Sequence, residues 1–162
     1  GFICIGKYRM MDPALKTLPN WASNINLPLL RYADILLLHA EAQYFLGDEP
    51  GARTTLSQVR ARSVQTGFSV TDLNNAYQKA DFVQELLDER SRELCFENWR
   101  RIDLARFNKF DETINNLSST DGFYNIRVVP TIKANWKPER VWFPIPTIQL
   151  DLNANLIQNQ GF

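Results

Sequence analysis

The feature that most constrains the fold is a run of apolar residues at three- and four-residue spacing, which begins at Leu29. Such spacing places one apolar stripe along an α-helix. The members of the stripe are Leu30, Ala33, Leu37, Ala40 and Tyr44. The pattern stops at Gly47, and Asp48, a favoured N-cap residue, opens a second apolar repeat that runs to about Ser63. The sequence therefore predicts a helical hairpin over residues 29–63.

Small residues in the two halves of this hairpin indicate how closely the helices approach. Ala40 and Ala52 lie on either side of the predicted turn, a spacing typical of a tetratricopeptide unit of helix, turn and helix. Such units stack on neighbours that cover their apolar faces, yet the sequence contains one copy. We therefore expect a fragment of a longer helical array, with a generic helical hairpin as the alternative.

The segment 81–107 predicts two further helices. Asp81 is a suitable N-cap with Gln84 as its capping-box partner, Asn98 suits a left-handed helix end, and Trp99–Phe107 continues as a second helical stretch. The residues expected to face the core are Val83, Leu86, Leu87, Leu94 and Phe96.

The remaining segments lack helical periodicity. Residues 1–28 are interrupted by prolines and predict an irregular lead-in with one short strand at Phe2–Tyr8. Residues 64–80 predict a polar connection. Residues 108–162 predict a loop-rich, non-helical tail with a short strand at Tyr124–Val129, because turn residues and prolines recur along it. The fold class expected is mainly α with little β structure, as a single domain over the whole chain.

Composition excludes several function classes. Eighteen lysines and arginines balance eighteen aspartates and glutamates, so the net charge does not favour binding to nucleic acid. Cys4 and Cys95 form no CxxC motif, which argues against a disulfide framework or a zinc site, and we expect two buried free thiols. No apolar run approaches the about 18 residues of a membrane span. We expect no metal or other cofactor.

The predicted first helix carries the only histidine, His39, which we interpret as a hydrogen-bonded core residue because it lies between Leu38 and Ala40. One histidine also excludes most histidine-dependent hydrolase motifs. We expect other polar residues of this helix to form ion pairs: Arg31, Asp34 and Glu41.

Three glutamates at one-turn spacing, Glu89, Glu93 and Glu97, allow two interpretations. Two of them could form the acid/base pair of a glycosidase. Alternatively, they form ion pairs that fix helix crossings, because arginines surround them in the sequence. The arginines are Arg90, Arg92, Arg100 and Arg106. We favour the structural interpretation, since guanidinium neighbours keep carboxylates ionised and a general acid must hold a proton.

Aromatic residues in the irregular segments are the candidate ligand contacts. The apolar face of a sugar packs on an aromatic ring while nearby amides bind its hydroxyl groups. Trp21, Tyr124 and Trp136 all lie beside asparagines, and a loop-anchoring role is the alternative for each of them.

Three blocks together carry a resemblance to a known family. They are Leu29–Ala42, Glu89–Arg106, and Pro144–Pro146 with Asn153–Phe162. In order, spacing and terminal position these blocks closely resemble the C-terminal part of the SusD/RagB family, the surface nutrient-binding lipoproteins of Bacteroidetes. The resemblance covers about residues 27–162.

The resemblance implies a mainly helical protein built on tetratricopeptide-like helix pairs, of which this chain forms the C-terminal portion. It implies non-catalytic binding of oligosaccharide, or in some members of peptide, at the outer-membrane surface. It further implies a lipid anchor outside this chain and hand-over to a SusC-like TonB-dependent transporter. The alternatives are a tetratricopeptide-like protein-interaction module and a carboxylate glycosidase.

Overall fold

The computed structural model describes residues 28–118 and 125–162, and these residues are mainly helical, as the sequence predicts. Within them there are α-helices and one 3₁₀ helix but no strand. The chain forms two compact units that divide between Arg100 and Arg101. No helix in the described segments is long and apolar enough to cross a membrane.

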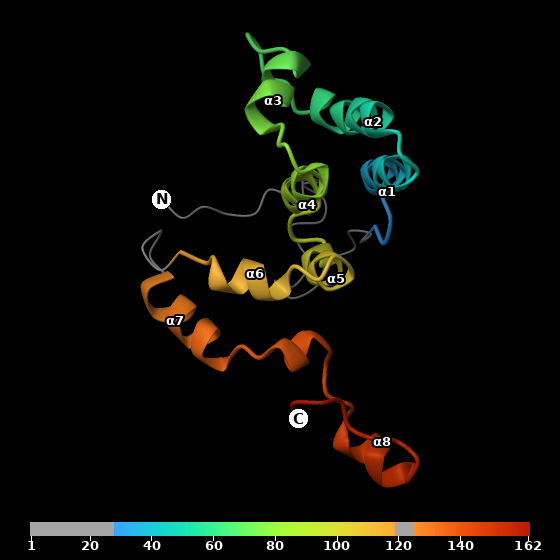
Figure 1. Ribbon diagram of the computed structural model, residues 1–162, viewed down its shortest axis with the longest axis vertical. Helices are drawn as coiled ribbons and strands as arrows, with labels where there is room; N and C mark the ends of the chain where they lie inside the picture. Colours follow the sequence, from blue (N-terminus) through green and yellow to red (C-terminus); the bar gives the residue numbers. More distant parts are fainter. Residues whose placement is uncertain (1–27, 119–124) are drawn as a thin grey trace, which may run out of the picture. The chain divides into compact units, whose positions relative to one another are not determined.

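The predicted hairpin is present as α1 (Tyr32–Phe45) and α2 (Glu49–Ala61), which lie side by side in Figure 1. Gly47 adopts a positive φ of 90°, a backbone conformation that glycine tolerates without strain. Asp48 then caps α2, because its Oδ1 accepts a hydrogen bond from the Gly51 backbone at 2.9 Å.

The core of the first unit lies where α1, α2 and α4 (Phe82–Glu93) meet. Ala40 and Ala52 are both fully buried, in agreement with the close helix approach that their size predicts. The larger apolar residues of this core are Leu37, Leu56, Val59, Phe82, Leu86, Leu87 and Leu94. The opposite side of α1 is also apolar but exposed, and it presents Tyr32, Ile35 and Leu38.

A short helix, α3 (Val70–Tyr77), lies within the segment predicted to be a polar connection, so that prediction is wrong for these residues. None of its residues is buried, which explains why apolar periodicity does not reveal it. It begins instead with a capping box: Ser69 Oγ accepts from the Asp72 backbone at 3.2 Å, and Asp72 Oδ2 accepts from the Ser69 backbone at 2.7 Å.

The predicted helices of segment 81–107 are α4 and α5 (Trp99–Arg106). Asp81 caps α4 through the Val83 backbone at 3.0 Å, while the side chain of Gln84 donates to Asp88 rather than closing the predicted capping box. Asn98 has the predicted positive φ, 66°.

Four predictions about individual side chains are wrong. Leu30, predicted as part of the apolar stripe of the first helix, precedes α1 and is 55% exposed. Phe96 is 60% exposed because α4 ends at Glu93, before Phe96, and the backbone of Phe96 adopts a positive φ of 64°. Cys95, just after the end of α4, is an exposed free thiol. His39 is exposed because Leu37 and Ala40 occupy the buried face of α1.

The second unit contains short helices where the sequence predicts a non-helical tail. They are α6 (Phe110–Asn115), α7 (Asn125–Asn135), the 3₁₀ helix η2 (Pro138–Val141) and α8 (Thr147–Leu152). The predicted strand at Tyr124–Val129 is wrong for residues 125–129, which open α7, since so short an apolar alternation does not separate strand from helix. Three other predictions lie outside the described residues: the strand at Phe2–Tyr8, the burial of Cys4, and the position of Tyr124 in the second strand.

Candidate functional site

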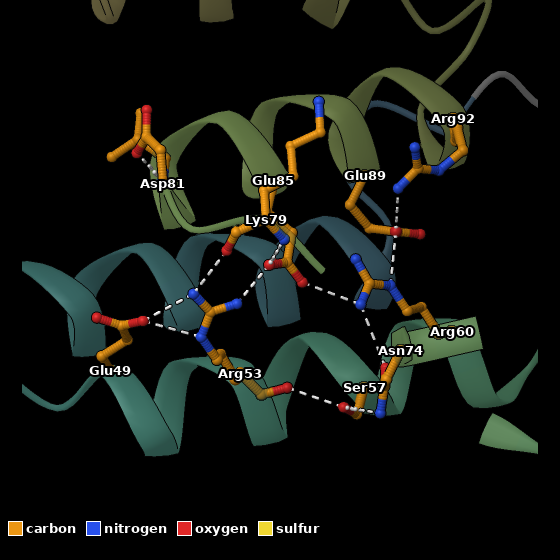
Figure 2. Close-up of polar contacts among 11 residues, drawn as sticks. Glu49, Arg53, Ser57, Arg60, Asn74, Lys79, Asp81, Glu85, Glu89 and Arg92 are labelled. Atoms are coloured by element: carbon orange, nitrogen blue, oxygen red, sulfur yellow. Dashed lines mark hydrogen bonds and ion pairs between the residues drawn. The ribbon is translucent and has the colours of Figure 1, made fainter. Parts of the chain in front are cut away.

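The interface of α2 with α4 holds a ladder of ion pairs (Figure 2). Arg53 and Arg60 lie two turns apart on α2, and Glu85 and Glu89 lie one turn apart on α4. Arg60 bridges both glutamates, from Nη1 to Glu85 Oε1 at 3.0 Å and from Nε to Glu89 Oε2 at 2.9 Å. Arg53 bridges Glu85 and Glu49, the latter at 2.7 Å. Each glutamate of the ladder is therefore held by guanidinium groups.

The ladder continues beyond Glu89 to the next glutamates of the charged segment. Glu93 accepts from Arg31 Nη2 at 3.0 Å and from Arg62 Nη2 at 2.5 Å. Arg31 Nε also donates to Glu97 Oε2 at 2.8 Å. The hydrogen bonds that Arg31 donates to Glu97 and to Glu93 raise the pKa of Arg31 despite the opposing effect of burial.

A deeply buried ion pair joins α4 to α1. Arg90 Nη1 lies 2.8 Å from Asp34 Oδ1, and both side chains are 1% exposed. The Arg90 guanidinium also lies 5.9 Å from the centre of the Trp99 ring. Burial of both charges makes this pair sensitive to the loss of either partner.

These contacts confirm the structural interpretation of the charged segment, although several partners differ from those predicted. Glu89 pairs with Arg92 as expected, but Arg31, Arg60 and Arg62 supply most of the remaining contacts. The other two predicted arginines bind elsewhere. Arg100 donates to the Leu87 carbonyl at 3.1 Å, and Arg106 lies 3.7 Å from Asp103. The glutamates at one-turn spacing therefore join helices through ion pairs with arginines of other segments.

An open pocket of about 360 Å³ lies beside the ladder, between the end of α2, α3 and α4. Its walls include Phe68 and Tyr77, and its polar groups include Arg60, Glu89 and Arg92. The Arg92 guanidinium lies over the Tyr77 ring at 4.2 Å from its centre. Because α3 forms one wall, sequence periodicity misses the pocket, and the capping box at Ser69 is the signal that could have revealed it.

Asn74 fixes α3 against the ladder. Its Oδ1 accepts from Arg60 Nη1 at 3.2 Å, and its Nδ2 donates to Ser57 Oγ at 2.8 Å (Figure 2). Hydrogen bonds from the side chain and backbone of Ser69 lower the pKa of Asp72 at the start of the same helix. The wall that carries Tyr77 is thus held at both its beginning and its middle.

Of the three aromatic residues predicted to contact a ligand, Trp136 is described and Trp21 and Tyr124 lie outside the described residues. The Trp136 ring stacks on Phe110, with 5.4 Å between ring centres. Its Nε1 donates to Asp111 Oδ1 at 3.0 Å. The ring is therefore held in one orientation while the residue stays partly exposed.

The second unit has its own apolar hollow of about 240 Å³, which sequence reasoning does not single out. Trp142 and Phe143 line it and are 66% and 70% exposed. Arg101 anchors this part of the chain, because its guanidinium lies 4.1 Å from the centre of the Phe143 ring and donates to the Val141 carbonyl at 2.6 Å. Within the described segments, no group of three or more His, Cys, Asp or Glu side chains could hold a metal ion.

Comparison with known proteins matches residues 3–162 to the SusD family. The chain is 40% identical over 93 residues to SusD-like protein P38 of Formosa agariphila, an alignment that covers 55% of this chain and 18% of that protein. It is 29% identical over 137 residues to the starch-binding protein SusD of Bacteroides thetaiotaomicron, covering 85% of this chain and 22% of that protein. SusD-like protein P25 of Formosa agariphila is 28% identical over 145 residues, an alignment that covers 88% of this chain and 25% of that protein.

The alignments span a quarter or less of the length of these relatives. No solved structure matches the chain significantly. The family match extends over nearly the whole chain, and the relatives carry the same family name. The chain therefore belongs to the SusD family.

Proposed function

We propose that this protein binds oligosaccharide without cleaving it, as part of a longer chain. The observation that carries the proposal is the SusD-family match over residues 3–162, because a relative aligned over 85% of this chain is named for starch binding. The alignment covers 22% of that relative, so the proposal concerns the class of ligand and not a particular glycan.

Aromatic stacking is the binding mode that suits such a ligand. The C–H face of a sugar ring packs on an aromatic ring, and amide groups bind its hydroxyls. We assign these contacts to Trp21, Tyr124 and Trp136. The stacking of Trp136 on Phe110 and its hydrogen bond to Asp111 support the assignment, since a ring already held in place loses little freedom on binding.

The arrangement of carboxylates supports binding without catalysis. The glutamates of the charged segment are paired with arginines, whereas a glycosidase needs one carboxyl group that holds a proton. Relatives named as SusD-like or starch-binding proteins support the same conclusion. The protein is accordingly proposed not to be an enzyme and to use no cofactor.

The proposed setting is the surface of the outer membrane. The natural protein is held there by a lipid anchor outside this chain and passes its glycan to a SusC-like TonB-dependent transporter. Transfer requires release, which suits micromolar to millimolar dissociation constants, or about 4 to 8 kcal/mol of binding free energy.

A second candidate is a tetratricopeptide-like module that binds a protein segment. The observation that favours it is the exposed apolar side of α1, where Tyr32 is 75% exposed and Ile35 and Leu38 are also accessible. Apolar residues grouped on one side of a helix often mark a contact surface. A protein captured in place of any glycan would favour this candidate.

Affinity electrophoresis of the natural full-length protein tests the proposal. Gels that contain starch or another neutral polysaccharide should retard the protein, and Trp21→Ala, Tyr124→Ala and Trp136→Ala should each weaken retardation by about tenfold. Trp142→Ala is the matched control, because this exposed tryptophan lies outside the assigned contacts. Equal migration in every glycan gel and in its absence would contradict the proposal.

A further inference from the structure

The pocket beside the ion-pair ladder is constructed from the first unit alone, with all its lining residues between Arg60 and Glu93. Its volume of about 360 Å³ is at the small end of the range for ligand pockets, about 300 to 1,000 Å³. A turn carries two of its lining residues, Gln65 and Phe68: the Phe68 backbone donates to the Gln65 carbonyl at 3.1 Å, and Gly67 takes a positive φ of 91°. The turn fixes the backbone of Phe68 at the pocket wall.

The pocket combines aromatic and polar walls. Phe68 is 62% exposed, whereas the Arg92 guanidinium covers the Tyr77 ring, with its carbon 4.2 Å from the ring centre. The Phe68 ring therefore offers the more open apolar surface of the two. A sugar ring can stack its C–H face on such a surface.

The charges of the pocket cancel. Arg60 and Arg92 both bind Glu89 Oε2, at 2.9 and 2.7 Å, and Glu93 is paired with Arg31 and Arg62. A buried nitrogen of Arg60, Nη2, has no hydrogen-bond partner in the described part of the chain. The site thus presents donors and acceptors without a net charge, whereas an anionic ligand would face two carboxylates.

We propose that this pocket is a subsite for one neutral sugar unit of the bound oligosaccharide, with Phe68 as its stacking surface and Arg92 as a hydroxyl-binding group. Hydroxyl groups both donate and accept hydrogen bonds, which matches the mixed lining. The inference rests on the proposed glycan-binding function and adds to it a site that is separate in sequence from Trp21, Tyr124 and Trp136.

Hydrogen–deuterium exchange of the natural full-length protein tests the location. The probes are maltoheptaose, cellohexaose and xylohexaose as neutral oligosaccharides, and trigalacturonate as an acidic one, each at millimolar concentration. We expect a neutral probe to slow exchange in residues 63–77. Slowed exchange elsewhere but not in this segment overturns the subsite while it supports the proposed function. No slowing anywhere with any probe contradicts both, and slowing of 63–77 by the acidic probe alone overturns the neutral class of ligand.

Two variants test the assignment of residues. Phe68→Ala should weaken binding of the protecting probe by about tenfold and abolish the slowed exchange of residues 63–77. Phe45→Ala is the matched control, because Phe45 is 64% exposed in the same unit and lies outside the pocket. Equal affinity of the Phe68 and Phe45 variants would overturn the role of Phe68 and with it the subsite.

Discussion

The two compact units of the chain are stabilised in different ways. In the first unit, α1, α2 and α4 bury large apolar residues such as Leu37, Leu56 and Leu86, and ion pairs join the same helices. In the second unit, few described residues are buried, and many large apolar side chains such as Trp142 and Ile157 are exposed. A continuous core is thus a property of the first unit.

The second unit relies on hydrogen bonds from side chains to the backbone. The Gln158 side chain binds both backbone groups of Ile145, an arrangement called here the clamp of the second unit. Its Oε1 accepts from the Ile145 backbone N–H at 2.8 Å, and its Nε2 donates to the Ile145 carbonyl at 2.9 Å. Asn159 donates to the Phe143 carbonyl at 2.7 Å. Each such bond contributes about 1 kcal/mol, whereas the loss of a buried apolar side chain or buried ion-pair partner costs about 2 to 5 kcal/mol. Single substitutions should therefore lower the free energy of unfolding more in the first unit than in the second.

The largest expected effect is loss of the buried Arg90–Asp34 pair. Arg90→Ala removes the guanidinium partner of the buried Asp34 side chain, which should lower the free energy of unfolding by about 3 to 5 kcal/mol. Urea denaturation of the natural protein measures the change. Arg92→Ala is the control, since its more exposed ion pair with Glu89 should contribute about 1 kcal/mol or less. If the two variants lowered the free energy of unfolding equally, the prediction that buried ion pairs matter more for stability than exposed ones would be contradicted.

The second largest effect is expected from a substitution that leaves a cavity in the apolar core of the first unit. Leu56 is fully buried, so Leu56→Ala should lower the free energy of unfolding by about 3 kcal/mol. Leu46, which is exposed, gives the matched control, and Leu46→Ala should stay within about 0.5 kcal/mol of the parent. If Leu46→Ala lowers the free energy of unfolding as much as Leu56→Ala does, Leu46 also packs in a core, and the contrast between buried and exposed leucines fails.

The clamp of the second unit predicts a smaller and more local effect. Gln158→Ala leaves both backbone groups of Ile145 unpaired and should cost about 1 to 2 kcal/mol. Hydrogen exchange should accelerate in residues 143–159 and stay unchanged in α1, α2 and α4. Gln160→Ala is the control, because Gln160 is exposed. Acceleration throughout the first unit would show that the two regions are not stabilised separately.

The smallest effect concerns the pH dependence of α3. Bonds from Ser69 lower the pKa of Asp72, so its stabilising contribution is present above the ordinary carboxyl pKa of about 4 and is lost as the pH falls through the lower folded value. Amide exchange in residues 70–77 should therefore accelerate in acid. In Asp72→Asn this acceleration should disappear, and its persistence would assign the pH dependence to another group.

Some features of the fold could be predicted from the spacing and type of residues, and others depend on local backbone geometry that apolar periodicity does not reveal. The hairpin around Gly47, the left-handed Asn98 and the ion-paired glutamates follow from spacing and residue type. Helix α3 does not, because a capping box and not an apolar stripe begins it. Periodicity also predicts Phe96 in the core, but α4 ends at Glu93 and Phe96 adopts a positive φ.

Some features of the candidate site could likewise be predicted from the sequence, and others could not. The structural role of the glutamates could be inferred because arginines surround them in the sequence. The pocket at Phe68 and Tyr77 could not, since it requires the turn at Gly67 and the position of α3. Residues joined by tertiary contacts, such as Arg31 and Glu97, are 66 positions apart and share no local pattern.

The most direct test of the central claim, binding without cleavage, is mass analysis of a glycan before and after prolonged incubation with the natural full-length protein. The glycan should be one that the protein retains in affinity electrophoresis. We predict that it is recovered from the complex with its mass unchanged. Shorter oligosaccharides with new reducing ends would contradict the account, because the protein would then cleave the glycan that it binds.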